Sequence, residues 1–376
     1  MNIPSSSCLS LMLFGVACTS QAQSSVTLYG IIDTGLVYVT NSSGHTAYQQ
    51  ASGKLSGDRW GLLGAEDLGN GMKAIFDLEN GFDLSSGKLG QNSRMFGRQA
   101  FVGLSDNRLG TLTLGRQYDS VVDYLALIPA TGTFEAHPYD NDNIHNSIRI
   151  NNAVKFQSID YGGFRFGGLY GFSNAAGSFA DSRAYSVGAS YKFGGLTLAS
   201  AYLQLNNPGS STNPNGAVAT GDSTFYAGRQ RTWGAGVNYT IGAAAVALLV
   251  TQTQLNNATA IGSSAAGTFG NLHLTGGSAQ FTNYEVSGTY RFTPSWSLNG
   301  AYTFTDARLD GVSPKYHQIA VLSDYAFSKR TDVYATAAFQ HVSSAGNSGI
   351  TADIYSIGRS STTSQFVTML GIRHRF

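Results

Sequence analysis

Cysteine is almost absent from this sequence. Its 376 residues include two, Cys8 and Cys18, and both lie within the first 22 positions. The rest of the chain therefore has no thiol for a disulfide bond or for a His/Cys metal site. A chain of this length without disulfides needs another source of stability, and a closed, fully hydrogen-bonded sheet would supply it.

Charged residues and long hydrophobic runs are scarce as well. Asp, Glu, Lys and Arg make up 12% of the chain, which is about half the usual share. The net charge of +1 argues against a nucleic acid as partner. After residue 22, the longest apolar run, residues 241–250, is too short for a membrane-spanning helix.

Glycine and aromatic residues are abundant instead. The chain has 46 Gly, 20 Tyr and 21 Phe, and aromatic residues reach 12% of the total. Few charges, many aromatic residues and no spanning helix together favour a transmembrane β-barrel, because only alternate residues of a barrel strand face lipid.

The first 22 residues have the pattern of an export signal. An apolar run at 8–18 precedes small residues at positions suited to cleavage, which predicts a signal peptide, residues 1–22, cut before Gln23. No Lys or Arg precedes Cys8, so the positively charged start usual for such peptides is missing. Two alternatives stay open: a short buried helix, and a lipoprotein signal ending at Cys18, although Gly15 stands where leucine is usual.

The dominant pattern in residues 23–376 is an alternation with period two. Several segments alternate for longer than the 5–6 residues of a usual globular strand. At the C-terminus, Phe366, Leu370, Ile372 and Phe376 share one face, and Arg373 and Arg375 share the other. A second segment alternates in the same way, with Trp296, Leu298, Tyr302 and Phe304 against Ser297, Asn299, Thr303 and Thr305.

The connections between the alternating segments are of two kinds. Seven short turns lie at 66–71, 105–110, 161–164, 193–196, 240–243, 292–295 and 327–330. Eight longer polar links lie at 41–46, 85–92, 119–147, 174–182, 206–222, 256–277, 306–314 and 342–363. They join sixteen strands, so both ends lie on the turn side, where the last strand can pair with the first and leave no edge in lipid. The sequence therefore predicts one all-β domain, a 16-stranded antiparallel transmembrane β-barrel.

Ordered motifs along the whole chain resemble those of the general diffusion porins of Gram-negative bacteria, in particular the betaproteobacterial branch. They are SVTLYGIID (25–33), RWGLLGAEDLG (59–69), GRQAFVGL (97–104), GTLTLGRQ (110–117), YAFSKRTDVY (325–334) and GIRHRF (371–376). The resemblance implies a homotrimer in the bacterial outer membrane, among its lipids and lipopolysaccharide, with a third loop folded into each pore. It also implies passive passage of small hydrophilic solutes and ions, no cofactor, and a role for Phe376 in the signal read by the outer-membrane assembly machinery.

The third long loop, residues 119–147, is rich in carboxylates and has no Lys or Arg. Arginines recur in the strands early in the chain. Because an Arg on the lipid face near mid-bilayer costs about 2–4 kcal/mol, these side chains should face the lumen. An acidic loop opposite a basic wall would create a transverse field across a narrow pore. By resemblance, the basic wall would comprise Arg59, Arg98, Arg116 and Arg149, and the acidic loop Asp123, Glu135, Asp140 and Asp142.

Strand parity supports these arginines unequally. Arg59 lies opposite in phase to Trp60 and Leu62, whereas Arg98 lies on an ambiguous face. Arg116 shares its phase with two leucines and would point outward unless a bulge near Gly115 shifts the pattern. Asp140 and Asp142 have a second interpretation, as ordinary solvated loop carboxylates.

Function classes other than a general pore are less well supported. The seven histidines belong to no recognised nucleophile motif, so an outer-membrane hydrolase has little support, although a chance Ser/His/Asp triad stays possible. A substrate-specific channel is the main alternative. Because guanidinium stays charged while crowded carboxylates can share protons, we expect a non-enzymatic pore with a weak preference for anions and no metal site.

Overall fold

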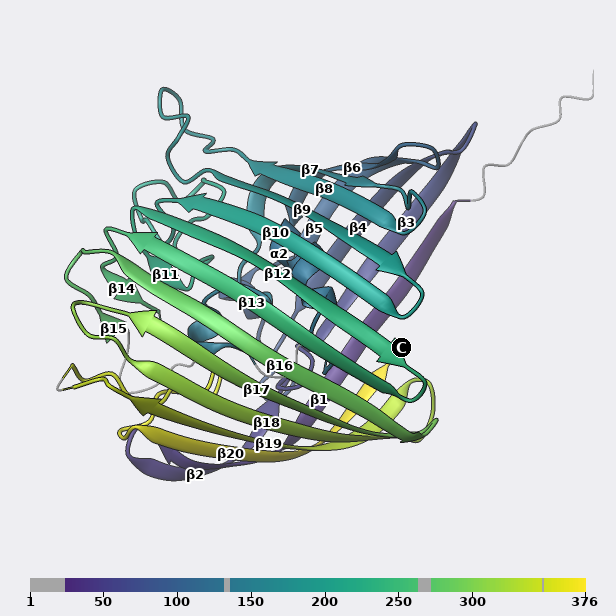
Figure 1. The fold of residues 1–376 in the computed structure, drawn as a ribbon. Helices are drawn as coiled ribbons and strands as arrows, with labels where there is room; N and C mark the ends of the chain where they lie inside the picture. Colours follow the sequence, from purple (N-terminus) through teal and green to yellow (C-terminus); the bar gives the residue numbers. More distant parts are fainter. Residues whose placement is uncertain (1–23, 132–135, 263–271, 347) are drawn as a thin grey trace, which may run out of the picture.

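The computed structural model describes residues 24–131, 136–262, 272–346 and 348–376, and most of them form one closed sheet (Figure 1). Its strands are β1 (Ser25–Ser42), β2 (His45–Ser52), β3 (Arg59–Gly69), β4 (Met72–Gly81), β5 (Gln99–Asp106), β6 (Gly110–Gln117), β7 (Ile150–Ser158), β8 (Phe164–Gly171), β9 (Ala184–Phe193), β10 (Leu196–Asn206), β12 (Arg229–Ile241), β13 (Ala244–Asn256), β16 (Ala279–Thr293), β17 (Trp296–Arg308), β18 (Lys315–Ala326), β19 (Thr331–Ser343) and β20 (Ser364–Arg375). A separate small sheet contains β11 (Phe225–Tyr226), β14 (Ala260–Ile261) and β15 (Leu272–His273).

The barrel closes between its first and last strands. β1 pairs antiparallel with β20 from Ile31 opposite Arg375 to Val39 opposite Val367. Along its other edge, β1 pairs first with β3 and then with β2, so β2 and β3 together occupy the place of one interrupted strand. Counted in this way, the structure is a sixteen-stranded antiparallel barrel, and the predicted architecture is confirmed.

The interruption between β2 and β3 was not anticipated from the sequence. Residues 53–58 leave the barrel wall, and Lys54, Leu55 and Ser56 line the internal cavity. The carboxylate of Asp33 accepts a hydrogen bond of 2.9 Å from the Ser56 amide, and the Asp33 amide donates to the Asp58 carboxylate. These contacts hold the segment on the inner side of the wall.

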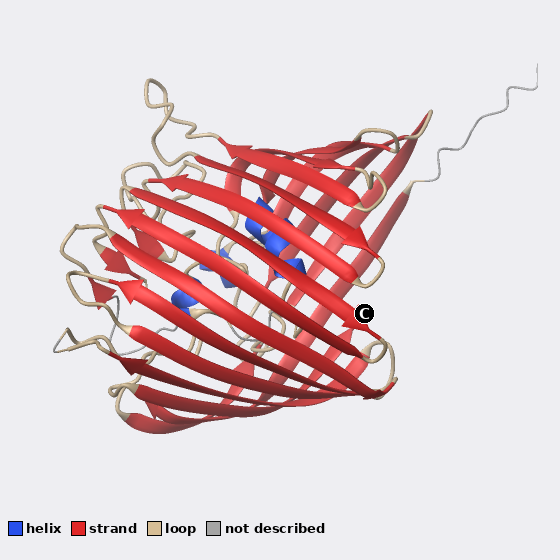
Figure 2. Ribbon diagram, viewed as in Figure 1, coloured by secondary structure: helices blue, strands red, loops and turns tan. Residues whose placement is uncertain are grey.

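Short and long connections lie at opposite ends of the barrel, as the sequence predicts (Figures 1 and 2). At the short end, β3 and β4 join through Asn70 and Gly71, whose φ angles are +54° and +82°. Two positive φ angles are those of the tight hairpin turn whose twist matches antiparallel strands.

Apolar residues face outward and small or polar residues face the lumen along most strands. In β13, Val246 and Leu248 are each 54% exposed, whereas Ala247 and Leu249 between and beside them are buried. Because lipid would cover the outer residues, their exposure in the isolated barrel is the expected pattern.

The third long loop folds into the barrel, as predicted, and carries most of the helical residues (Figure 2). Asp119 caps the first of these helices by accepting a 2.7 Å hydrogen bond from the Val121 amide. None of the helices in the described part of the chain is long and apolar enough to cross a membrane. The helical segments are α1 (Gly90–Ser93), α2 (Ser120–Tyr124) and the 3₁₀ turns η1 (Leu125–Leu127) and η2 (Pro138–Asp140).

Apolar contacts fix this loop against the inner wall. Val121, Leu125 and Ile128 are fully buried in one cluster with Leu203 of β10 and Leu249 of β13. Each such side chain contributes about 1.5–3 kcal/mol when it leaves water. The first half of the loop is therefore a packed part of the barrel interior.

Candidate functional site

The centre of the barrel contains a polar cavity of about 820 Å³ beside the third loop. All four arginines that the sequence proposes for a basic wall line it: Arg59, Arg98, Arg116 and Arg149. We call these four residues the arginine wall. Among the residues that the structure describes, the other charged residues that line the cavity are Lys54, Glu79 and Asp222.

Glu79 of β4 holds two of the wall arginines. Its carboxylate lies 2.7 Å from Nε of Arg98 and 3.6 Å from Nε of Arg59. The hydroxyls of Tyr29 and Tyr118 each donate to the same carboxylate at 3.2 Å. These contacts fix both arginines in position. Since one carboxylate faces two guanidinium groups, the cluster keeps a net positive charge.

Arg149 lies just before β7. It and Arg98 are the two most buried members of the arginine wall. Its guanidinium carbon lies 5.5 Å from the centre of the Tyr118 ring, in a cation–π arrangement. Burial and the neighbouring Arg98 lower the pKa of Arg149 to about 10. The side chain therefore stays charged at neutral pH.

Arg116 reaches the cavity through an irregularity in β6. The pairing of β6 with β7 shifts between Gly115 and Gln117, and Gly115 has a φ angle of +140°. The guanidinium then donates to the Gly97 carbonyl oxygen at 2.8 Å and lies 3.0 Å from the Asp222 carboxylate. This irregularity is a β-bulge of the kind that shifts the alternation of side chains and so turns Arg116 inward.

The carboxylates of the third loop are placed differently from the expectation of an acidic face toward the pore. Asp123 is paired with Lys155 of β7 at 2.9 Å. The Asp140 carboxylate accepts hydrogen bonds from the Ser147 hydroxyl and amide and from the amide of His145, all within the loop. Burial raises the pKa of Asp140 to about 6.

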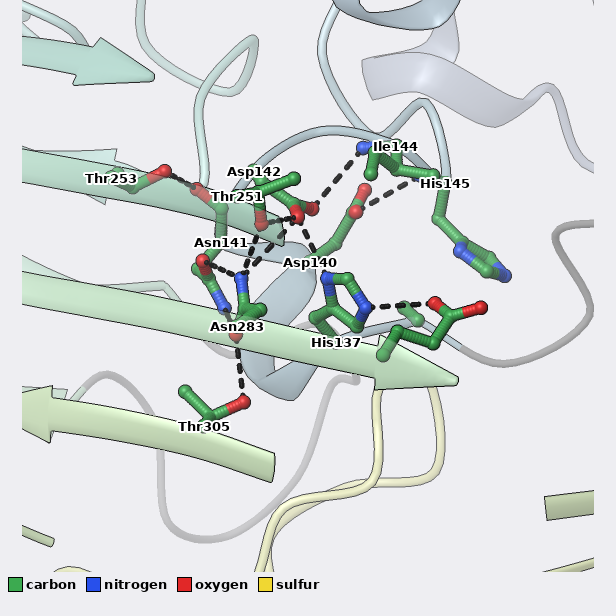
Figure 3. Close-up of polar contacts among 12 residues, drawn as sticks. His137, Asp140, Asn141, Asp142, Ile144, His145, Thr251, Thr253, Asn283 and Thr305 are labelled. Atoms are coloured by element: carbon green, nitrogen blue, oxygen red, sulfur yellow. Dashed lines mark hydrogen bonds and ion pairs between the residues drawn. The ribbon is translucent and has the colours of Figure 1, made fainter. Parts of the chain in front are cut away.

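Asp142 turns toward the opposite wall of the barrel (Figure 3). Its carboxylate is fully buried, lies 2.7 Å from Nδ1 of His137, and accepts hydrogen bonds from Thr251 of β13 and Asn283 of β16. Neither Asp140 nor Asp142 is among the residues lining the cavity. The physical reason is that a buried carboxylate needs donors, and the loop and the far wall provide them. Glu135 lies outside the described residues.

Sequence reasoning missed the partners of the arginine wall. The rule that a charged mid-strand side chain faces the lumen would have found Glu79, which lies in β4. Asp222 lies in the irregular connection between β10 and β12, where no periodic signal exists. In the part of the chain that the structure describes, no three or more His, Cys, Asp or Glu side chains are grouped to hold a metal ion.

Comparison with known proteins places the chain in a family. A model described as Gram-negative porin matches residues 7–345. The chain belongs to the Gram-negative porin family. An outer membrane porin protein of Bordetella pertussis is 32% identical, over 97% of this chain and 98% of that protein. Outer membrane porin protein 32 of Delftia acidovorans is 28% identical, over 98% of this chain and 99% of that protein.

Solved structures agree with this assignment. An anion-selective porin from Comamonas acidovorans has a TM-score of 0.74 and 25% identity, and the match covers 94% of this chain and 100% of that one. OmpT of Vibrio cholerae, in trimer form, matches at a TM-score of 0.66 over 94% of this chain and 99% of that one, and at 15% identity it shows the fold alone. This porin is an outer-membrane general diffusion channel, a passive path for small hydrophilic solutes.

Proposed function

We propose that the arginine wall gives this diffusion channel a weak preference for anions. The observation that carries the proposal is the charge around the central cavity, where, among the residues that the structure describes, five cationic side chains meet two carboxylates. The carboxylates are Glu79 and Asp222, and the cations are Lys54 and the four members of the arginine wall.

The third-loop carboxylates in the described part of the chain do little to offset this excess. Asp123 is paired with Lys155, and Asp140 and Asp142 are buried among donors of the protein. A ring of fixed guanidinium groups at a narrow level raises the local concentration of anions and lowers that of cations. The similar structure from Comamonas acidovorans is that of an anion-selective porin, which is consistent with this proposal.

We also infer the assembly of the channel from its family. The proposal is a homotrimer with one pore in each barrel, exported with a signal peptide, residues 1–22, and embedded in outer-membrane lipids and lipopolysaccharide. Phe376, at the end of the last strand, would be part of the signal recognised by the assembly machinery. Phe376 is 41% exposed and is therefore accessible to such machinery.

The test is the reversal potential of single channels in a KCl gradient across a planar bilayer. Arg59→Ala and Arg149→Ala should each raise the potassium-to-chloride permeability ratio and change conductance. Arg165→Ala is the matched control, because Arg165 is 61% exposed, pairs with Asp160 and does not line the cavity. Wild-type reversal potentials in both wall variants would contradict the proposal, and conductance that saturates with one solute would favour a substrate-specific channel.

A further inference from the structure

The connection between β10 and β12, residues 207–228, is bound to distant parts of the long-loop end. Ala217 and Val218 are fully buried in the apolar cluster that also holds the third loop. The Ala217 carbonyl oxygen accepts a 3.0 Å hydrogen bond from the Asn151 amide at the start of β7. The side-chain amide of Asn92, in the connection between β4 and β5, donates to the Gly221 carbonyl oxygen at 2.6 Å. These contacts hold the tip of the connection at the cavity.

Asp222 follows directly and joins three separate segments. Its carboxylate accepts two hydrogen bonds from Arg94, of 2.5 and 2.9 Å, and lies 3.0 Å from the guanidinium of Arg116. Asn151 donates to it at 2.9 Å. The Asp222 side chain is 1% exposed, whereas the Arg94 side chain is 34% exposed. One carboxylate therefore lies between two guanidinium groups, one of which belongs to the arginine wall.

We propose that Asp222 is a selectivity-determining residue, whose carboxylate reduces the positive potential of Arg94 and Arg116 and so limits the anion preference of the pore. This inference rests on the proposed anion preference. Asp222 and Arg116 both line the cavity, so their charges act on the ions that pass.

The contacts of Arg116 indicate that its position does not depend on Asp222 alone. Its guanidinium also donates to the Gly97 carbonyl oxygen at 2.8 Å and to the side-chain oxygen of Asn151 at 2.5 Å. The Arg116 side chain is itself only 10% exposed, so a neutral acceptor has to replace the carboxylate. Asp222→Asn supplies one, because the side-chain oxygen of asparagine accepts hydrogen bonds from guanidinium groups. With these hydrogen bonds to Gly97 and Asn151 kept, Asp222→Asn removes the negative charge while Arg116 stays beside the cavity.

The experiment compares Asp222→Asn with wild type by reversal potential in a KCl gradient. A unit charge at the lining of a narrow pore, screened by salt, changes a permeability ratio by roughly two- to five-fold. We expect the chloride-to-potassium ratio of Asp222→Asn to rise by that factor. The matched control is Asp310→Asn, which removes one carboxylate from an exposed site bound to Thr275 and should leave the ratio unchanged. An unchanged or lower ratio in Asp222→Asn overturns the proposal.

Two further measurements separate this inference from the proposed function. If Arg149→Ala lowers the chloride-to-potassium ratio while Asp222→Asn leaves it unchanged, the arginine wall stands and the role of Asp222 fails. If neither variant moves the ratio, the proposed function fails. Should Asp222→Asn give no assembled barrel, Arg94→Gln decides, because it removes one cation from the same cluster and must lower the ratio; an unchanged ratio overturns the proposal.

Discussion

His137 of the third loop lies 3.0 Å from the carboxylate of Glu285 on β16, through its Nε2 atom. Its other ring nitrogen lies 2.7 Å from the Asp142 carboxylate, and the side chain is 3% exposed (Figure 3). Both ring nitrogens face carboxylates and must donate, which requires the doubly protonated imidazolium. His137 therefore joins the loop to the barrel wall as a buried cation between two anions.

The first prediction is the pH dependence of this link. Burial alone would lower the pKa of His137, but Asp142 and Glu285 raise it to about 10. The folded value lies above the unfolded value of about 6.5. The stabilisation is thus complete below about pH 6.5 and is lost as pH rises toward 10. The temperature at which the barrel unfolds in detergent, followed by its shift in gel mobility, should fall across that range.

Substitution of His137 tests the same link. His137→Gln leaves two buried carboxylates without their cation, and breaking such a pair costs about 3–5 kcal/mol. We expect a lower unfolding temperature at pH 6 and a weaker pH dependence between 6.5 and 10. His273→Gln, at an exposed site in β15, is the control. An unfolding temperature equal to that of wild type at pH 6 would show that the link contributes little.

The barrel itself could be predicted because the face of a strand residue is a local property. Period two places Leu370 and Ile372 outside and Arg373 inside, and the structure agrees. The break at residues 53–58 could not be predicted in this way. It depends on a hydrogen bond from the Asp33 amide of β1 to the Asp58 carboxylate, two residues that are far apart in sequence. No alternation in the sequence encodes that contact.

The inward position of the four arginines was predictable for the same reason, whereas their role as a selectivity site stays a prediction. Placing an arginine in lipid is costly, and this restricts the wall residues to the lumen. The acidic side has no such constraint, because a loop carboxylate can turn to any donor. Asp142 bonds to Thr251, which is 109 residues away in sequence, and Asp222 bonds to Arg94, which is 128 residues away. Neither partnership has a sequence signal.

A second prediction concerns Gly115 and the bulge that turns Arg116 inward. A Cβ atom at Gly115 would lie 2.1 Å from the Ala100 carbonyl oxygen, and the φ angle of +140° is strained for any other residue. We expect Gly115→Ala to lose about 1–3 kcal/mol of stability and to lower the anion preference by displacing Arg116. Gly277→Ala, with open space around its Cβ position, should change neither the unfolding temperature nor the reversal potential.

A third prediction concerns the carboxylate that fixes two wall arginines. Glu79→Gln removes one negative charge from the cavity and weakens the 2.7 Å contact with Arg98. The reversal potential should therefore move toward higher chloride permeability, and the unfolding temperature should fall. Glu66→Gln, at an exposed position near the β3–β4 turn, should do neither. A shift toward potassium in Glu79→Gln would mean that Arg98 had moved out of the pore.

The last prediction concerns the C-terminal residue. The backbone of Phe376 exchanges two hydrogen bonds of 3.1 Å with Gly30, at the seam where the barrel closes. Its ring covers Gly30, since a Cβ atom there would lie 2.3 Å from the ring. If Phe376 belongs to the signal read during assembly, its deletion should reduce the assembled protein in the outer membrane while export across the inner membrane continues. Membrane fractionation with a gel mobility assay measures both quantities.

Two control variants separate an assembly signal from ordinary seam packing. Phe376→Tyr keeps a terminal aromatic ring and the backbone pairing with Gly30, so it should assemble normally. Phe327→Ala removes another outward aromatic ring, 66% exposed near the β18–β19 turn, and should cost only a little stability. If deleting Phe376 left outer-membrane levels normal and lowered only the unfolding temperature, the residue would act as a seam contact alone. Closure between Gly30 and the last strand would then account for the whole of its role.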